Sequence, residues 1–158
     1  MRRTDKEITD RATIDRILHE AEVLRVAMVD ADRRPYLIPV NFGYHQNSLF
    51  IHSAPEGTKL DILRVSPEVC FEVDIRAEVH QAEQACNWSM KYFSVIGFGT
   101  VSFLGDIADK RQAVQTIMKK YSGRDDWPIQ DAVLIPLSVW KIEIRSLTGK
   151  RSKYESFD

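Results

Sequence analysis

The run from Tyr92 to Leu104 constrains the fold of this chain more than any other stretch. It reads YFSVIGFGTVSFL, and its β-branched and aromatic residues predict one long strand. Gly97 and Gly99 stand at alternate positions in it, which predicts a sharp bend or a close backbone approach. A second long strand is predicted from residue 69 to about residue 79. Because bends let a sheet curl, long antiparallel strands of this kind predict a closed or nearly closed barrel.

The remaining patterns predict shorter strands and helices around this barrel. Asp10 can cap a first helix, in which Ile14, Ile17, Leu18 and Ala21 recur at helical spacing. Further strands are predicted at residues 24–29, 36–44, 48–53 and 132–145, with Pro136 at a bulge or an edge, and further helices at residues 60–63 and 108–121. Short turns join the strands within residues 24–53, so an antiparallel meander is expected there. The predicted fold class is mainly β, a β-barrel with peripheral helices.

The composition predicts one cytoplasmic domain, residues 1–158. The length fits a single core, and the formal net charge of -1 gives no field that would attract nucleic acid or an acidic membrane. No signal-peptide pattern and no long apolar run occur, so no membrane partner is expected. The basic residues 150–153 are interpreted as a solvated tail. Cys70 and Cys86 support no disulfide framework, and the scattered histidines predict no metal site.

Candidate binding residues gather where a predicted strand gives way to a helix. Ser53, Gly57 and Lys59 supply a hydroxyl, a glycine and an ammonium there, which are the groups that hold a phosphate. The spacing is not that of a P-loop, and Lys59 is equally well explained as a solvated lysine beside a helix cap. Asn41 lies in the preceding strand, where asparagine is depleted. It indicates either a contact with a flat ring or a bond to a neighbouring backbone group.

Three further side chains are candidates for the same site. Ser94 begins the glycine-bent part of the long strand, with Lys91 close by as a second donor. A hydroxyl on a strand is weak evidence unless the fold brings it to the other donors. His52 directly precedes Ser53 and, with a pKa near neutrality, could donate a proton in the pocket. A strand histidine with satisfied hydrogen bonds is the simpler explanation, and no G-x-S-x-G nucleophile motif occurs.

The ordered set of motifs resembles that of a known family. The stretches that carry the resemblance are Arg2-Arg3 with Glu7-Ile8, residues 39–44, His52-Ser53-Ala54 with Gly57 and Lys59, residues 69–73, residues 94–99 and Thr148-Gly149-Lys150. Over about residues 2–153 the chain resembles the pyridoxamine 5'-phosphate oxidase-related, FMN-binding split-barrel proteins. Within them it is most similar to the branch of 5-nitroimidazole-resistance reductases.

The resemblance implies a flavin-reductase-like split β-barrel. It also implies a homodimer with two FMN molecules held at the subunit interface. Pro39, Val40, Asn41 and Phe42 would run along the isoalloxazine ring, largely through their backbone.

The resemblance also assigns the other end of the cofactor. His52, Ser53 and Ala54 would lie near the ring and the ribityl chain, and Lys59 and Ser94 would bind the 5'-phosphate.

One position departs from the family pattern. Many relatives carry arginine where this chain has Phe93, directly before Ser94. The departure implies that a phosphate contact is lost or that Lys91 provides it.

The function implied is that of an FMN-dependent oxidoreductase. It would take electrons from a reduced nicotinamide or another small donor and pass them to a small acceptor, with nitroaromatics as candidates. The redox chemistry would belong to the flavin, so no protein nucleophile is required, and His52 is the one catalytic candidate. The alternatives are a flavin storage or sensing module and a split barrel that uses a deazaflavin or haem. Oxidation of pyridoxamine phosphate itself is disfavoured because no second basic cluster is present.

Overall fold

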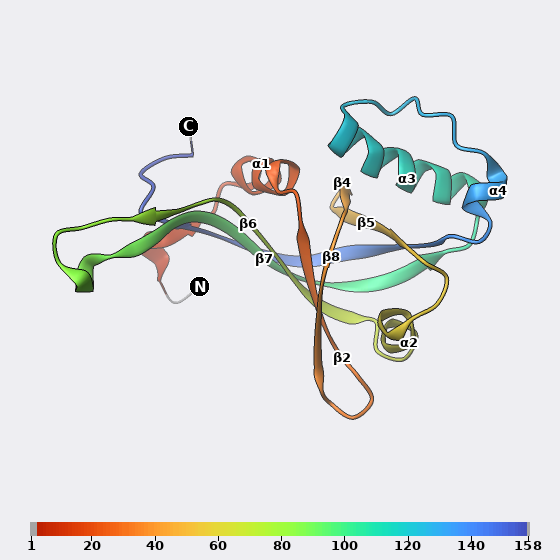
Figure 1. Cartoon of the computed structure of the whole chain (residues 1–158), viewed down its shortest axis with the longest axis horizontal. Coiled ribbons are helices and arrows are strands. Elements are labelled where there is room, and N and C mark those ends of the chain that lie inside the picture. The colour runs from red at the N-terminus through yellow and green to blue at the C-terminus, as the bar shows by residue number, and fades with distance from the viewer. Residues whose placement is uncertain (1–2, 158) are drawn as a thin grey trace.

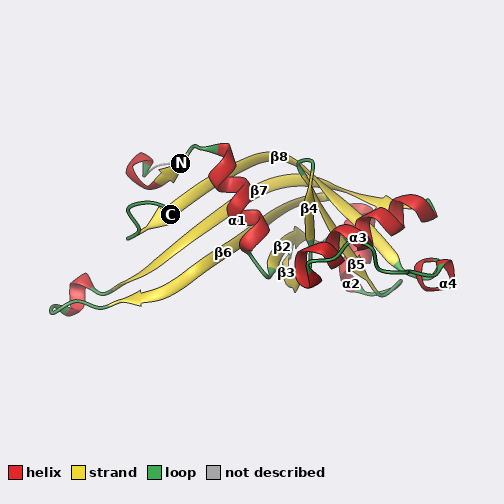
Figure 2. Ribbon diagram, turned by 90° about the horizontal axis from the view of Figure 1, so that it is seen from above, coloured by secondary structure: helices red, strands yellow, loops and turns green. Residues whose placement is uncertain are grey.

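The computed structural model describes residues 3–157 and shows a curled sheet with helices around it (Figures 1 and 2). The strands are β1 (Glu7–Ile8), β2 (Leu24–Val29), β3 (Pro35–Val40), β4 (Gly43–His45), β5 (Ser48–Ser53), β6 (Glu68–His80), β7 (Ser89–Leu104) and β8 (Ser138–Ser152). The helices are α1 (Arg11–Glu20), α2 (Thr58–Val65), α3 (Ile107–Ser122) and α4 (Asp131–Leu134), with single 3-10 turns at Thr4–Lys6 and Ala85–Asn87. Arg2, in the first family motif, lies outside the described residues. Among residues 3–157, none of the helices has the length and apolar character needed to cross a membrane.

The order of the strands shows why the sheet is curled. Neighbouring strands follow the order β3-β2-β6-β7-β8-β5-β4, and β1 pairs with β8. Every pairing is antiparallel. Strands β3 and β4 therefore stand at opposite ends of this order, yet only Asn41 and Phe42 separate them in the chain. The sheet must curl until its two ends come close, as the glycine-bent strands predicted.

The two glycines of β7 lie where its backbone approaches its neighbours. A Cβ atom on Gly97 would lie 2.2 Å from the ring of Phe71, and one on Gly99 would lie 2.5 Å from the carbonyl oxygen of Glu143. The register between β7 and β8 also shifts between Phe98 and Gly99, which is the irregularity that bends a strand. The predicted close approach is confirmed at both glycines.

The first helix begins where the sequence predicted. Asp10 precedes α1, and its side chain accepts a hydrogen bond of 2.8 Å from the backbone N–H of Thr13. Ile14, Ile17 and Leu18 are buried in the core that α1 and α2 share with the inner face of the sheet. The α1 prediction is therefore confirmed in both its cap and its apolar face.

The prediction of one strand over residues 36–44 within a three-strand meander is wrong. The chain leaves β3 after Val40 and enters β4 at Gly43 on the far edge of the sheet. The reason is a contact distant in sequence: Phe42 is fully buried, and its backbone N–H donates to the hydroxyl of Tyr121 instead of to a strand. Asn41 consequently lies in the link between β3 and β4, not inside a strand.

The prediction of a last strand over residues 132–145 is also wrong at both ends. Its start forms α4, and the buried ammonium of Lys110 donates to the backbone carbonyls of Leu134, Ile135 and Leu137, which are therefore not available for a strand ladder. Pro136 therefore precedes β8 and occupies no bulge. At the other end β8 continues to Ser152, so most of the predicted basic tail is a paired strand.

Strands β6 and β7 run on beyond the barrel, toward the left of Figure 1. We call this part the extension, residues 74–94 with residues 150–152 of β8. Its inner face is covered by the C-terminal residues: the ring of Phe93 stacks on Tyr154 at 4.6 Å and meets Phe157 edge-on at 5.0 Å. Phe93 is 1% exposed, so the chain's own terminus completes the packing on this face.

Candidate functional site

The turn between β5 and α2 offers the clearest site for an anion. Gly57 precedes α2 with a φ of 132°, a conformation that favours glycine, and it provides no side-chain cap. By contrast, aspartates cap both α1 and α3. The first N–H groups of α2 therefore lack a side-chain acceptor, and Lys59 lies among them. Within residues 3–157 the Lys59 ammonium has no acidic partner.

The other residues of this turn are also accessible. His52 lies opposite Val139 in the β5–β8 ladder, and Ser53 ends the strand with its hydroxyl donating to the carbonyl of Ala54 at 3.2 Å. Although His52 is exposed at the surface, the groups packed around its ring lower the pKa of the imidazole through desolvation, which favours the neutral form. We call His52, Ser53, Ala54 and Lys59 the β5–α2 group.

The end of β3 divides into exposed and buried positions. Pro39 and Asn41 are exposed, Val40 is half-buried, and Phe42 is fully buried in the core. The N–H of Phe42 is already bonded to Tyr121, at 3.1 Å. Of the four residues predicted to line a ring, Phe42 is therefore part of the core, and the other three are at least partly exposed at the surface.

Ser94 belongs to a different part of the molecule, the outer face of the extension, where only 8% of its surface is exposed. Its neighbours in the ladder are Asp74 on β6 and Lys150 on β8, and the Lys150 ammonium donates to the hydroxyl of Tyr92 at 2.6 Å. We call Tyr92, Ser94 and Lys150 the β7–β8 group. Sequence reasoning missed Lys150 as a donor beside Ser94 because it treated residues 150–153 as a tail. The alternation of Ile142 and Ile144 breaks at Ser146, so no apolar pattern indicated that the strand continues to Lys150.

Lys91 does not lie with Ser94. Its ammonium is 3.0 Å from the carboxylate of Glu78 and 5.6 Å from the ring centroid of Tyr154. Phe93 stacks on the same tyrosine, so Lys91 and Phe93 share the inner face of β7. Ser94 points to the opposite face, since successive residues of a strand alternate. The structure therefore brings Lys150, and not Lys91, to the side of Ser94.

The β5–α2 group and the β7–β8 group are separate within one chain. Arg64 of α2 lies 6.0 Å from the ring of Phe103, near the end of β7. Ser94 lies nine residues before Phe103, a separation of as much as about 30 Å along an extended strand. No contact between the described residues joins Lys59 to Ser94. One chain thus presents the predicted phosphate donors as two separate groups.

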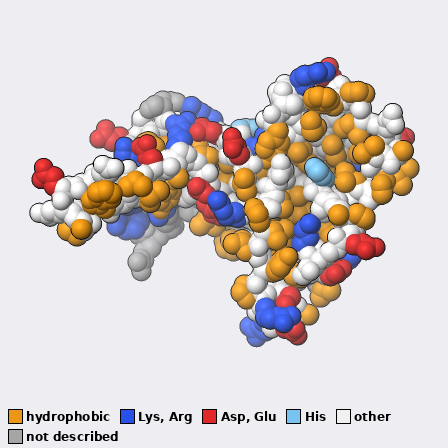
Figure 3. Space-filling model, viewed as in Figure 1, with side chains coloured by type: hydrophobic (Ala, Val, Ile, Leu, Met, Phe, Trp, Pro, Cys, Tyr) orange, Lys and Arg blue, Asp and Glu red, His pale blue; other side chains and the backbone are white. Residues whose placement is uncertain are grey.

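Apolar side chains are exposed around the extension, as Figure 3 shows at the left. Val79 and Met90 face each other across β6 and β7 with 56% and 42% of their surface exposed, and Trp88 near the tip is 51% exposed. Ile96 and Phe98 continue the exposed surface along the outer face of β7. Apolar surface gathered in this way is typical of a protein interaction site.

A polar cavity of about 640 Å³ lies away from both groups. It is an open cleft between the end of α1, β4 and α3, and its lining includes His19, Tyr44 and Lys120. None of the residues predicted to bind a cofactor lines it.

The curled antiparallel sheet, divided between β3 and β4 and covered by helices, defines this protein as a split barrel. The family model described as pyridoxamine 5'-phosphate oxidase matches residues 10–151. The chain belongs to this family, which confirms the resemblance drawn from the motifs.

Solved structures agree with this assignment. A proposed 5-nitroimidazole antibiotic resistance protein from Bacteroides thetaiotaomicron is 32% identical, with a TM-score of 0.82 over 92% of this chain and 86% of that chain. A flavocytochrome from Azotobacter vinelandii is 17% identical, with a TM-score of 0.84 over 100% and 74% of the two chains. A FAD- and haem-binding protein from Mycobacterium smegmatis is 21% identical, with a TM-score of 0.81 over 97% and 76%. The last two show the fold alone. No curated protein matches the sequence.

Proposed function

We propose that this protein binds FMN as a homodimer and reduces a small acceptor, with nitroaromatic compounds as the candidate class. The observation that carries the proposal is the start of α2, where uncapped N–H groups and the unpaired Lys59 ammonium follow β5 directly. Similar proteins support it, because a flavocytochrome and a FAD- and haem-binding protein share the fold. The similar protein from Bacteroides thetaiotaomicron, described by its link to 5-nitroimidazole resistance, supports the class of acceptor.

The residues present fit a flavin mononucleotide. A phosphate that is nearly doubly ionised requires charge-assisted donors, which Lys59 and the first N–H groups of α2 supply. The exposed residues Pro39 and Asn41 are available to the polar edge of the ring, and the His52 imidazole can hold a proton beside it. When bound, the flavin supplies the electron transfer, and the protein binds it, orients it and excludes water.

The proposal requires two copies of the chain. Lys59 and Ser94 are separate within one chain, and the exposed apolar surface around the extension is of the kind that a dimer buries. In the dimer that we propose, the β7–β8 group of one copy approaches the β5–α2 group of the other. Ser94 and Lys150 would then complete the phosphate site that Lys59 begins.

The first test is the visible absorption spectrum of the purified protein, as isolated and after FMN is added and the sample desalted. Flavin bands that persist with altered shape would support the proposal. A colourless protein that releases all the FMN would overturn it, and so would a protein that retains haem but no flavin.

The division of the site between copies has its own test. We would co-express a Lys59→Ala chain with a chain that carries Ser94→Ala and Lys150→Ala. In a symmetric dimer with shared sites, each heterodimer has one site that carries every substitution and one intact site. Random pairing makes about half of the dimers heterodimers, so about a quarter of all sites recover full affinity. A site built within one chain would show no recovery.

Reduction is tested separately from binding. The FMN-loaded protein should reduce a nitroimidazole with NADH or NADPH faster than the same concentration of free FMN does. A rate equal to that of free FMN would leave a flavin-binding module and would contradict the reductase part of the proposal.

A further inference from the structure

We propose that Lys120 and Tyr121, in the last turn of α3, are positioning residues for the cofactor. They would hold the link Asn41–Phe42 in the place from which the end of β3 contacts the flavin. This inference rests on the proposed function, and it adds two residues that no family motif includes.

Tyr121 joins this link to the chain segment that follows α1. Its hydroxyl accepts the backbone N–H of Phe42 at 3.1 Å and donates to the carbonyl oxygen of Glu22 at 2.7 Å. Glu22 lies between α1 and β2. One hydroxyl therefore satisfies two backbone groups that belong to no helix or ladder bond.

Lys120 contacts the same link through the ring of Phe42. Its ammonium donates to the carbonyls of Leu18 and His19 at 2.8 and 2.7 Å, which are among the carbonyls left unpaired in the last turn of α1. The same nitrogen lies 4.3 Å from the centroid of the Phe42 ring. This arrangement adds a cation–π contact to the burial of the ring.

The position of Asn41 depends on these contacts because the sheet does not fix it. The ladder of β3 ends at Val40, and that of β4 begins at Gly43. A Cβ atom on Gly43 would lie 2.8 Å from the backbone nitrogen of Ile117, so α3 also packs directly against the start of β4. Residues on α3 thus fix both the amide and the ring of Phe42, and with them the exposed residue before it.

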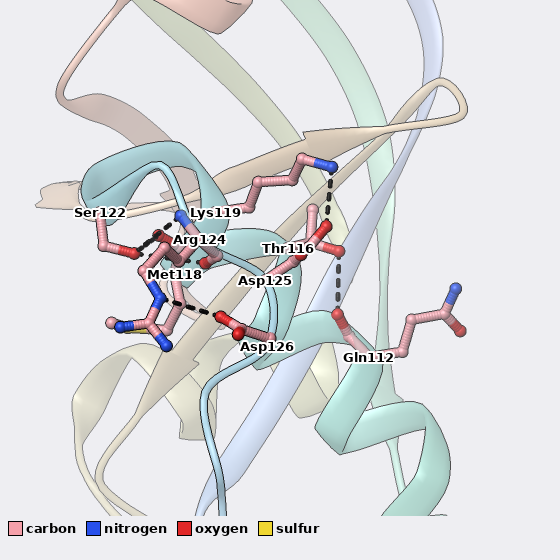
Figure 4. A network of polar contacts seen from close by, with 8 residues as sticks. All are labelled: Gln112, Thr116, Met118, Lys119, Ser122, Arg124, Asp125 and Asp126. Atoms are coloured by element: carbon pink, nitrogen blue, oxygen red, sulfur yellow. Dashed lines mark hydrogen bonds and ion pairs between the residues drawn. The ribbon is translucent and has the colours of Figure 1, made fainter.

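The end of α3 is itself well fixed, as Figure 4 shows. The Ser122 hydroxyl donates to the carbonyl of Met118 at 2.7 Å, and Lys119 forms an ion pair with Asp125 at 2.8 Å. Lys119 is the neighbour of Lys120 but bonds to the loop that follows α3 instead of to the link. It therefore provides a matched control.

The experiment compares Tyr121→Phe and Lys120→Met with the control Lys119→Met. In the protein without flavin, amide hydrogen exchange at Phe42 should become about fivefold faster in Tyr121→Phe, the scale of one lost hydrogen bond. The control should exchange like the unchanged chain. With FMN, both test variants should raise the Kd about fivefold or more and shift the visible flavin bands, whereas the control should do neither.

The outcomes separate the two proposals. If the unchanged chain does not bind FMN, the proposed function fails before any variant is compared. If the unchanged chain binds FMN and both test variants bind it with the control's affinity and spectrum, the positioning role is overturned. In that case the positioning role is overturned even if hydrogen exchange at the Phe42 amide becomes faster. The contacts of Lys120 and Tyr121 would then contribute to the stability of the fold and not to FMN binding.

Discussion

The barrel and the extension differ in what covers their apolar side chains. In the barrel, Trp140 and Phe42 are fully buried among residues from the strands, α1 and α2. In the extension, Phe93 is covered by the chain's C-terminal residues on one face, whereas Val79 and Met90 remain exposed. The core of the barrel is therefore closed within one chain, although the barrel also exposes apolar side chains such as Leu37 and Val65. The extension has a covered face and a face whose apolar side chains one chain leaves exposed.

The predicted cofactor residues follow the same division. The β5–α2 group lies at the barrel, where a helix start supplies the donors, and the β7–β8 group lies on the extension, where cross-strand neighbours supply them. Neither group by itself therefore contains all the donors that the motifs indicate, because the fold keeps Lys59 and Ser94 apart within one chain. The predictions that follow test each side of the division.

Replacing Phe93 by alanine should have the largest effect. It removes a buried ring that stacks on Tyr154 and meets Phe157, so the free energy of unfolding should fall by about 3–5 kcal/mol. Urea unfolding followed by circular dichroism measures this change. Val133→Ala is the control, because that side chain is 60% exposed on α4, away from the extension, and should contribute little. Equal losses in the two variants would show that the C-terminal residues do not close this face.

Lys59→Ala should weaken FMN binding by about 1.5–3 kcal/mol, the scale of a hydrogen bond to a charged group. Isothermal titration or flavin fluorescence measures the affinity. Lys91→Ala should leave it unchanged, because Lys91 pairs with Glu78 on the face opposite to Ser94. An effect of Lys91 as large as that of Lys59 would contradict the division that we draw between the two faces of β7.

Ser94→Ala should weaken FMN binding by about 0.5–1.5 kcal/mol, as expected for one hydroxyl donor. The same titration measures it, and Ser102→Ala serves as the control, since Ser102 is on β7 but outside both groups. An unchanged affinity in Ser94→Ala would remove the extension from the cofactor site and leave the β5–α2 group alone.

The sequence was sufficient wherever a local pattern decides the structure. The glycine bends of β7, the Asp10 cap of α1 and the Gly57 turn before α2 each depend on neighbouring residues, and each was predicted. The break at Phe42 was not predictable in this way, because its amide pairs with Tyr121 from a distant helix. The end of α4 and the turn into β8 are held similarly by the distant Lys110.

The candidate site shows the same limit. Lys59 follows its turn directly, so the sequence alone places it beside Gly57, whereas Lys150 becomes a neighbour of Ser94 only through the β7–β8 register. The separation of Lys91 from Ser94 was available from the sequence, since an odd number of residues along a strand places two side chains on opposite faces.

The smallest predicted effect concerns Lys120, which joins the barrel link to α1. Burial lowers the pKa of Lys120 from 10.5 to about 8. Between pH 8 and 10.5 the unfolded chain therefore binds more protons than the folded one, so the free energy of unfolding rises with pH in that window. Solvent screening of the partly exposed ammonium should limit the rise to about 1 kcal/mol.

Other groups titrate as well, so the measurement is the difference in the free energy of unfolding between the unchanged chain and Lys120→Met, taken by urea unfolding at pH 7 and pH 9.5. The difference should shift in favour of the unchanged chain at the higher pH. A shift in the other direction would mean that the two carbonyls of α1 outweigh burial and keep the ammonium charged, which would make the contact with the barrel link stronger than its burial indicates.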